Sequence, residues 1–393
     1  MPCSKPSFRP QVLTKPFILS FLLLCLASQS QASWQAQYHL SSQWQQQGQD
    51  EPLPLPMADS PWLGSQHLSL IYQQQGLYAH LRWQQPDLEQ GGELVLPELY
   101  YDADLPQQDA WALSLGAKHW QWDYQYAYSP LNWLGFAPQS SKLPLAQPMV
   151  LLEHFAASSV WQLGCTLQDS PLCLARSEWF GQQWDGQLLL GYQQGWQSGL
   201  AGQWLATDAL NLRASLMWQE SYQWQEFSIA NSHSWLSQPP WIERNDSNWQ
   251  GVLGATFSTG NGWQLIAEHG YQQRALSAED WQQLLALAAW QQQQGEHPAK
   301  AGNQLWLAQA SLQTALSQHQ SLVRLSYQQG DWQPYGWLQL HWLEQPSYLL
   351  EIGNHWQWNS QASIQLAYRY HDAQGPLATL GQQVRLALEL TTF

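Results

Sequence analysis

The feature that most constrains this chain is a strict two-residue alternation in the stretch ALNLRASLMWQ, Ala209–Gln219. Apolar side chains recur at the even positions from 210 to 218, and the odd positions between them carry Asn, Arg, Ser, Met and Gln. Successive side chains of a strand point to opposite faces, so the stretch predicts a β-strand with two unlike faces. A soluble β-sandwich would bury the apolar face in a core, whereas a membrane barrel would turn it to lipid and line its lumen with the polar face.

The alternation recurs along the chain, with turn-forming residues between successive segments. The links at 207–209 and 259–262 are short enough for tight turns, and 220–248 is long enough for a loop on the opposite side. Alternating short and long connections are typical of outer-membrane barrels. We therefore predict an all-β fold, a single antiparallel transmembrane β-barrel of about 16–18 strands with one short loop helix, over residues 33–393.

The N-terminus has the three parts of a secretory signal. Basic residues precede the apolar run FILSFLLLCLA at 17–27, and small residues stand at the cleavage positions before Ser33. The apolar run is too short for a spanning helix. We predict that residues 1–32 are a cleaved signal peptide and that the protein is exported to the outer membrane of a Gram-negative bacterium.

The charge of the chain excludes one class of partner. The sequence has 29 Asp and Glu against 14 Lys and Arg, and three of the basic residues lie in the predicted signal. The mature chain then has 29 acidic and 11 basic residues, a net charge near −18. Nucleic-acid binding needs a basic footprint, so we expect no nucleic-acid partner.

Two of the four cysteines, Cys3 and Cys25, lie in the predicted signal. The other two, Cys165 and Cys173, flank the turn-forming sequence QDSP, and a hairpin would bring them together. In an exported protein we expect them to form a disulfide, with two free thiols as the alternative. No further Cys or His pair has the spacing of a metal site, so we predict no metal and no cofactor.

One segment, 277–295, departs from the alternation and has apolar residues at helical spacing. Ser277 is a candidate N-cap, and Asp280 stands where a capping box has Glu or Gln. Gly295 is a suitable helix end. We predict a short helix packed on a long loop; the alternative is that this helix constricts the pore.

The chain is rich in aromatic residues, with 27 Trp and 16 Tyr, many of them near the ends of the alternating segments. Rings with an apolar and a polar part favour the membrane–water boundary, so we expect aromatic girdles at both rims. The alternative is that they are core residues of a secreted β protein. The candidate membrane-interface aromatics are Trp83, Trp111, Trp218, Trp249, Trp263 and Trp342.

Phe393 matches the terminal aromatic residue by which barrel-insertion machinery recognises many outer-membrane barrels, and we expect that machinery to be a partner. The apolar positions from Val384 to Leu390 have the opposite parity from Phe393. A β-bulge near 391–392 would restore the register. The alternative is that the terminal Phe is coincidental.

Basic residues on the polar faces of the segments are candidate lumen residues: Arg82, Lys118, Arg213, Arg324 and Arg369. Aromatic faces stack on sugar rings and Gln amides bind hydroxyl groups. The negative net charge disfavours polyanions by repulsion. We therefore expect small polar or neutral solutes, saccharides among them.

No GxSxG, HExxH or phosphate-binding loop occurs in the sequence. The stretch NSHSW at 231–235 has Ser and His side by side, but neighbours on one strand point to opposite faces and do not converge. We therefore predict no catalytic residue and do not expect an enzyme.

The run Glu98–Leu134 resembles a block in porin-like Gram-negative outer-membrane β-barrels, among them uncharacterised exported barrels and, more distantly, alginate-export-type channels. There a strand with an acidic and aromatic start precedes a strand ending in Gly-Lys, then Trp-Gly, then a Ser-Pro-Leu-Asn/Asp loop. Here Ala117 separates the Gly from the Lys, the Gly after the Trp is absent, and SPLN stands at 129–132. Gly262–Trp281 similarly resembles a strand and loop start. The resemblance covers about half of the mature chain, implies a single transmembrane barrel and leaves the cargo open.

These observations predict a porin-like outer-membrane channel, in contact with lipid, for small polar or neutral solutes. The runner-up is a structural or surface-polymer-interacting barrel without an open pore. An outer-membrane hydrolase is the third hypothesis. The sequence does not fix an oligomeric state.

Overall fold

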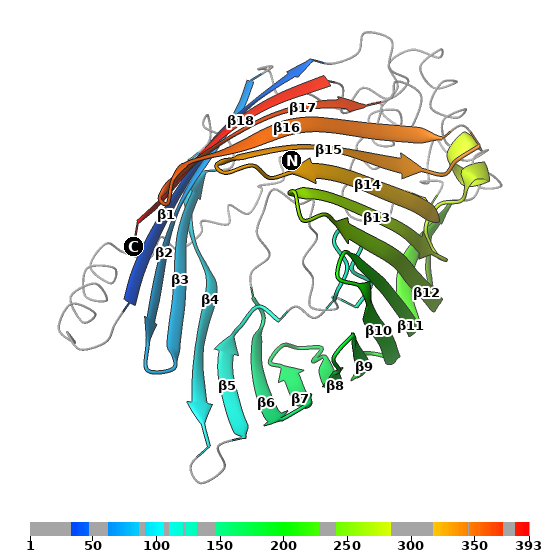
Figure 1. Cartoon of the computed structure of the whole chain (residues 1–393). Helices are drawn as coiled ribbons and strands as arrows, with labels where there is room; N and C mark the ends of the chain where they lie inside the picture. The colour runs from blue at the N-terminus through cyan, green and yellow to red at the C-terminus, as the bar shows by residue number, and fades with distance from the viewer. Residues whose placement is uncertain are drawn as a thin grey trace, which may run out of the picture.

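The computed structural model describes residues 33–46, 62–85, 91–105, 110–120, 123–131, 146–227, 241–283, 317–344, 346–371 and 382–392. Within these ranges the chain forms one 18-stranded antiparallel sheet (Figure 1). Its strands are β1 (Ser33–Gln46), β2 (Trp62–Gln74), β3 (Leu77–Gln85), β4 (Glu93–Asp104), β5 (Trp111–Ala117), β6 (Pro148–Ala156), β7 (Ser159–Thr166), β8 (Cys173–Phe180), β9 (Trp184–Tyr192), β10 (Trp196–Thr207), β11 (Leu210–Phe227), β12 (Trp241–Ser258), β13 (Trp263–Gln272), β14 (His319–Tyr327), β15 (Trp332–His341), β16 (Ser347–Asn359), β17 (Ala362–His371) and β18 (Gln382–Thr392).

The sheet closes on itself because β1 pairs with both β2 and β18. Leu40, for example, lies opposite Gln66 on one side and Leu388 on the other. Figure 1 shows the first and last strands, blue β1 and red β18, side by side in the ring. The predicted single antiparallel barrel is confirmed, and the strand number lies at the upper end of the predicted range.

The two faces of the strands meet different surroundings, as the alternation predicts. On β11, Leu216 is 48% exposed while its neighbours Ser215 and Met217 are 5% and 3% exposed. On β9, Leu188 and Leu190 are exposed while Gln187 and Leu189, on the other face, are completely buried. The outward face is therefore apolar and the inward face largely polar, which is the inverse of a soluble β protein.

Short turns join the strands at one end of the barrel, as predicted for 207–209 and 259–262. The β2–β3 turn has the backbone geometry of a tight hairpin turn, with positive φ at both Gln75 and Gly76. Asp102 N of the neighbouring strand β4 donates to Gly76 O at 2.9 Å. A Cβ on Gly76 would lie 2.1 Å from Asp102 O, so only glycine fits there.

The predicted loop over 220–248 is wrong at 220–227 and 241–248, which are strand, and its middle, 228–240, lies outside the described residues. β11 continues to Phe227 and β12 begins at Trp241, and their ladder resumes after a register shift between Gln219 and Tyr222. Neighbouring strands β10 and β13 end near the level of that shift. Beyond it neither strand pairs with a third strand among the described residues, and the apolar alternation that marks a barrel strand is lost although the pairing of β11 with β12 continues.

The predicted helix begins where the sequence indicates. Ser277 Oγ accepts from Asp280 N at 3.1 Å, and Ser277 N donates to Asp280 Oδ2 at 2.9 Å, which is a capping box with Asp in place of Glu. Helical residues follow at 278–283 and lie beyond the strand ends in Figure 1, while 284–295 are outside the described residues. The described part of the helix therefore does not constrict the lumen. In the described ranges no helix is long and apolar enough to cross a membrane.

The predictions for the two chain ends have different outcomes. Residues 1–32 and Phe393 lie outside the described residues, so the signal peptide and the terminal insertion signal stay predictions. The β1–β18 ladder runs without a register shift to Thr392, so the bulge predicted near 391–392 is wrong. All six predicted interface tryptophans stand at outward positions, and their grouping into two girdles stays a prediction.

The predicted disulfide is present. Cys165 at the end of β7 and Cys173 at the start of β8 are cross-strand partners with Cα atoms 4.1 Å apart. Both side chains are at outward positions. Thr166 follows Cys165 directly, and its Oγ1 accepts from Leu172 N at 2.9 Å, which shapes the loop between the two strands.

We expect no free thiol in the mature protein when it is denatured without reductant and titrated with a thiol reagent. Reduction should lower the free energy of unfolding by about 2–3 kcal/mol, because the closed loop is short. Two reactive thiols in the unreduced protein would contradict the assignment.

Candidate functional site

A segment after β5 folds into the barrel instead of away from it. We call residues 118–131 the inward loop; 121–122 within it are outside the described residues. Its atoms contact inward side chains of strands that lie far around the ring, including β8, β11, β13 and β14. The inward loop is the candidate functional site because it lies inside the ring, where it contacts four strands of the inner wall.

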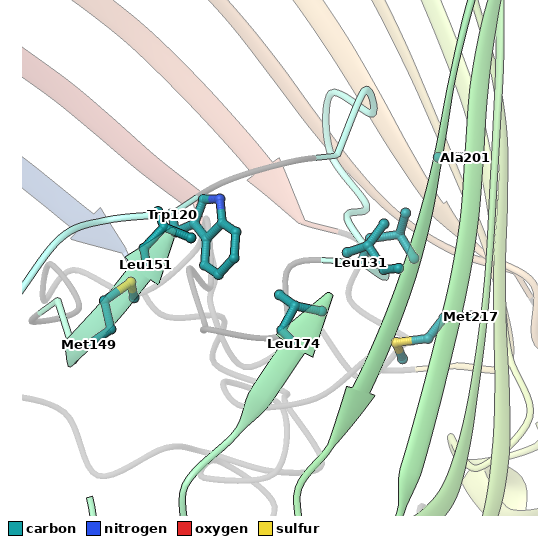
Figure 2. Packing of buried hydrophobic residues seen from close by; sticks show 8 residues of the cluster. Trp120, Leu131, Met149, Leu151, Leu174, Ala201 and Met217 are labelled. Carbon is teal, nitrogen blue, oxygen red and sulfur yellow. The ribbon is translucent and has the colours of Figure 1, made fainter. Parts of the chain in front are cut away.

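An apolar cluster holds the two ends of the inward loop against the wall (Figure 2). The members are Trp120 and Leu131 from the loop and, from the inward faces of β6 and β8–β11, Met149, Leu151, Leu174, Leu189, Ala201 and Met217. Leu131, Met149, Leu151 and Leu189 are at most 1% exposed. Burying each large side chain contributes about 1.5–3 kcal/mol. The cluster also explains why Met217 occurs on the polar face of β11: the inward loop covers it.

Glu268 on β13 is the polar anchor of the inward loop. Its side chain is completely buried, and its two oxygens accept hydrogen bonds from the backbone N–H groups of Tyr126 and Ala127, the latter at 2.7 Å. Arg213 Nη2 lies 3.3 Å from Glu268 Oε1 and supplies the compensating charge. A buried carboxylate with two amide donors and a guanidinium is fully satisfied, so the anchor is both strong and specific in geometry.

Arg213 ties the same region together from β11. Its Nη1 donates to the carbonyl oxygen of Tyr124 at 2.8 Å and its Nη2 donates to Thr256 Oγ1 at 3.0 Å. The side chain is only 11% exposed. The guanidinium of this predicted lumen base therefore binds the inward loop, Glu268 and Thr256 and is largely shielded from water.

Asp123 fixes the fold of the inward loop itself. Its Oδ1 accepts from Ser215 Oγ of β11 at 2.7 Å, and its Oδ2 accepts from Leu131 N at 3.1 Å. Burial raises the pKa of the Asp123 carboxyl, and the hydrogen bonds from Ser215 and from backbone amides oppose that shift. Gln125 Nε2 adds a second bond to Ser215 Oγ at 3.0 Å.

Glycines on the inner wall make room for the inward loop. A Cβ built on Gly254 of β12 would lie 2.9 Å from Gln125 Oε1, and one built on Gly270 of β13 would lie 3.3 Å from the ring of Tyr128. An inward glycine in a barrel strand marks a close approach of another part of the chain. The wall and the loop are therefore matched in shape over β12 and β13.

Aromatic and basic side chains line the inner wall from β14 to β17, and the inward loop meets this wall at Arg324. Arg324 Nη1 donates to Tyr126 Oη at 2.6 Å, and its guanidinium lies 5.2 Å from the Tyr126 ring centroid and 5.5 Å from that of Tyr335. Arg369 Nη2 lies 2.7 Å from Glu351 Oε2 and over the ring of Trp337. This wall combines π-faces with charged hydrogen-bond donors.

A second group of this kind lies at the start of the inward loop. Lys118 Nζ is 3.2 Å from Asp102 Oδ1 and 3.7 Å from Glu153 Oε2, and it lies 4.9 Å from the Tyr100 ring centroid. Tyr100 stacks on Tyr78 with centroids 4.9 Å apart. Arg82, on the neighbouring wall, donates from Nε to Ser69 Oγ at 2.9 Å.

All five predicted lumen bases thus point inward, but the structure does not gather them into one strip. Arg213 and Arg324 contact the inward loop, and Lys118 is part of its start. Arg82 and Arg369 lie on strands β3 and β17, away from it along the ring. Their contact with a solute stays a prediction.

The residues that the sequence analysis missed are those that fix the inward loop, above all Glu268 and Asp123. Two signals were present. Gly254 and Gly270 leave inward positions of strands without a side chain, and Glu268 stands between Gly270 and Ile266 on the same inward face. A carboxylate flanked by small or apolar inward residues indicates a buried partner rather than an open lumen.

Comparison with solved structures supports the fold. OccK2 (OpdF) of Pseudomonas aeruginosa is 11% identical, with a TM-score of 0.54 and 92% of this chain and 97% of that chain covered. Acinetobacter baumannii OccAB1 is 9% identical, with a TM-score of 0.53 and coverages of 92% and 96%. P. aeruginosa OccK5 (OpdH) is 10% identical, with a TM-score of 0.51 and coverages of 92% and 97%.

Identities this low show similarity of fold alone. No family model and no curated protein matches the sequence. The more distant resemblance to alginate-export-type channels is not supported by these comparisons. The porin-like barrel that the other part of the resemblance implies agrees with the observed fold.

We expect Glu268→Gln to loosen the inward loop without opening the barrel. A neutral amide accepts hydrogen bonds less strongly and turns an N–H group toward one of its three donors, which costs about 2–3 kcal/mol. Hydrogen exchange at the Tyr126 and Ala127 amides should therefore accelerate by roughly 30- to 150-fold. Glu279→Gln, the same change on the exposed rim helix, is the control. Unchanged protection of both amides in Glu268→Gln would contradict the anchor.

Proposed function

We propose that this protein is a porin-like channel of the Gram-negative outer membrane, whose pore is narrowed by the inward loop. The observation that carries the proposal is the combination of an apolar outer face, a polar inner face and a loop anchored inside a closed ring. The solved structures of OccK2 (OpdF), OccAB1 and OccK5 (OpdH) have a similar fold. The absence of catalytic motifs in the sequence agrees with a channel.

The outer membrane is proposed because the barrel exposes apolar side chains around its outside. Leu253 on β12 is 66% exposed, and Leu366 on β17, five strands further around the ring, is 54% exposed. In water such a belt would cost about 25 cal/mol for every Å² of apolar surface. A bilayer removes that cost, and the closed ladder leaves the described sheet without an open edge.

We expect the native protein to fractionate with the outer membrane and to require detergent for extraction. Its outward leucines would otherwise drive aggregation. Fractionation of cells that express the full chain, followed by detection in the periplasmic and membrane fractions, checks this. Recovery of folded protein from the periplasm without detergent would overturn the membrane assignment.

Small polar or neutral solutes, saccharides among them, are proposed as the cargo. The supporting feature is the lining itself: Tyr126 and Trp337 offer π-faces, and Gln365 offers an amide at an inward position. Aromatic faces pack on the apolar faces of sugar rings, and amides bind hydroxyl groups.

We expect reconstituted pores to conduct ions with a preference for cations. The mature chain carries 29 carboxylates against 11 bases, and Arg213, Arg369 and Lys118 are already neutralised by ion pairs. The preference should grow in dilute salt, because the Debye length rises from about 10 Å at 0.1 M to about 30 Å at 0.01 M. A reversal potential across a planar bilayer under a salt gradient measures it.

Two results would change the proposal. Anion preference would mean that Arg82 and Arg324, whose described contacts are hydrogen bonds rather than ion pairs, dominate the field at the narrowest point. No conductance from a folded, reconstituted protein would favour the structural or surface-polymer-interacting barrel instead.

A further inference from the structure

Two histidines on the outer face of the barrel bring their ring nitrogens together. His269 on β13 and His319 on β14 are exposed, and His269 Nε2 lies 3.3 Å from His319 Nδ1. The ring planes are inclined by 27° and the ring centroids are 5.5 Å apart. With nitrogens only 3.3 Å apart, that centroid separation is too long for a face-to-face stack, so the two nitrogens meet edge to edge. Glu268 and Gly270, the neighbours of His269, point into the lumen, so this pair is separate from the inward loop.

The spacing of the pair matches one edge of a metal coordination sphere. Zinc binds imidazole nitrogen at about 2.0–2.1 Å with tetrahedral geometry, so two imidazole nitrogens on one ion are about 3.3–3.4 Å apart. In the present arrangement each ring points along the line between the nitrogens. A turn of roughly 35° by each ring would aim both lone pairs at a common point without changing the spacing.

A second shell already orients His269. Its Nδ1 lies 2.8 Å from Ser321 Oγ, and Trp342 Nε1 donates to the same oxygen at 2.8 Å. When Ser321 accepts from His269 Nδ1–H, the proton is on the nitrogen away from His319, and Nε2 is free to bind. A hydrogen bond of this kind to the non-ligating nitrogen is the usual support of a metal-binding histidine.

The partner ring is held by packing. The His319 ring lies 5.0 Å from the ring of Tyr271, and Trp342 N donates to the His319 carbonyl oxygen at 3.0 Å. In the metal-free pair one facing nitrogen carries the proton of the shared hydrogen bond. Binding needs only a shift of that proton from His319 Nδ1 to Nε2, with no net proton release from two neutral imidazoles.

We propose that His269 and His319 form a surface binding site for a divalent transition ion of the kind that prefers imidazole, Cu²⁺ or Zn²⁺. Among the described residues no group of three His, Cys, Asp or Glu side chains is placed to hold a metal. Water would therefore fill the other coordination positions of the bound ion. Both ligands stand at the ends of their strands farthest from the short turns, where an ion can reach them from the aqueous phase. Imidazole affinity for Cu²⁺ exceeds that for Zn²⁺ in the usual order of divalent ions.

The test uses the tag-free, detergent-purified full barrel. Titration with Cu²⁺ should give one site whose electron paramagnetic resonance spectrum shows coupling to two nitrogen ligands, and Zn²⁺ should compete for it. His269→Ala and His319→Ala should each weaken Cu²⁺ binding at least 10-fold and remove one nitrogen from the spectrum. Ser321→Ala should weaken binding by about 10-fold, as loss of second-shell support does.

His154→Ala is the matched control, because His154 is an outward histidine on β6 that packs on the Trp111 ring with centroids 4.6 Å apart. It should leave the site unchanged. His269→Gln, which keeps a polar side chain of similar reach, serves if the alanine variant does not fold. Absence of binding by the wild type at 100-fold excess of Cu²⁺, or equal binding by both histidine variants and the control, would overturn the proposal.

Discussion

Every other feature of this protein depends on the ladder between β1 and β18. A sheet of this length with two open edges would expose unpaired N–H and C=O groups in its first and last strands. Pairing of 36–46 with 382–392 removes both edges and turns the sheet into a ring. Once the ring is closed, each strand has an inside and an outside, and the two-residue period of the chain assigns every side chain to one of them.

The closed ring also creates the problem that the inward loop solves. A lumen of this circumference cannot be filled by the side chains of the wall alone, so part of the chain occupies it. Trp120 and Leu131 at the two ends of the loop pack against apolar side chains of the wall. The middle of the loop is held by hydrogen bonds from its backbone to Glu268. Apolar burial holds the ends of the segment, and the carboxylate determines where its middle lies. The position of the loop inside the ring is thus set by a few long-range contacts.

The sequence was sufficient for the parts of the structure that repeat. The alternation at Ala209–Gln219 predicted both the strand and the direction of its two faces, and the spacing of Cys165 and Cys173 predicted their bond. The sequence was insufficient where a single long-range contact determines the position of a segment. No sequence feature near Glu268 identifies Tyr126 as its partner. The hydrogen bond between them forms only after the ring has brought β13 opposite the loop. The extended β11–β12 ribbon was missed because strand pairing there continues after its side-chain pattern has ended.

The contacts of the inward loop also set an order of events during folding. Tyr124, Gln125 and Tyr126 bond to residues 54, 90 and 198 positions later in the chain. The entropy of closing such long loops must be overcome before those bonds can form. The loop emerges early in synthesis, yet its contacts with Glu268 and Arg324 can form only after β13 and β14 have joined the wall. Placement of the loop is therefore a late step of assembly, and a barrel that stalls before β14 joins would leave the loop without its attachment to Arg324.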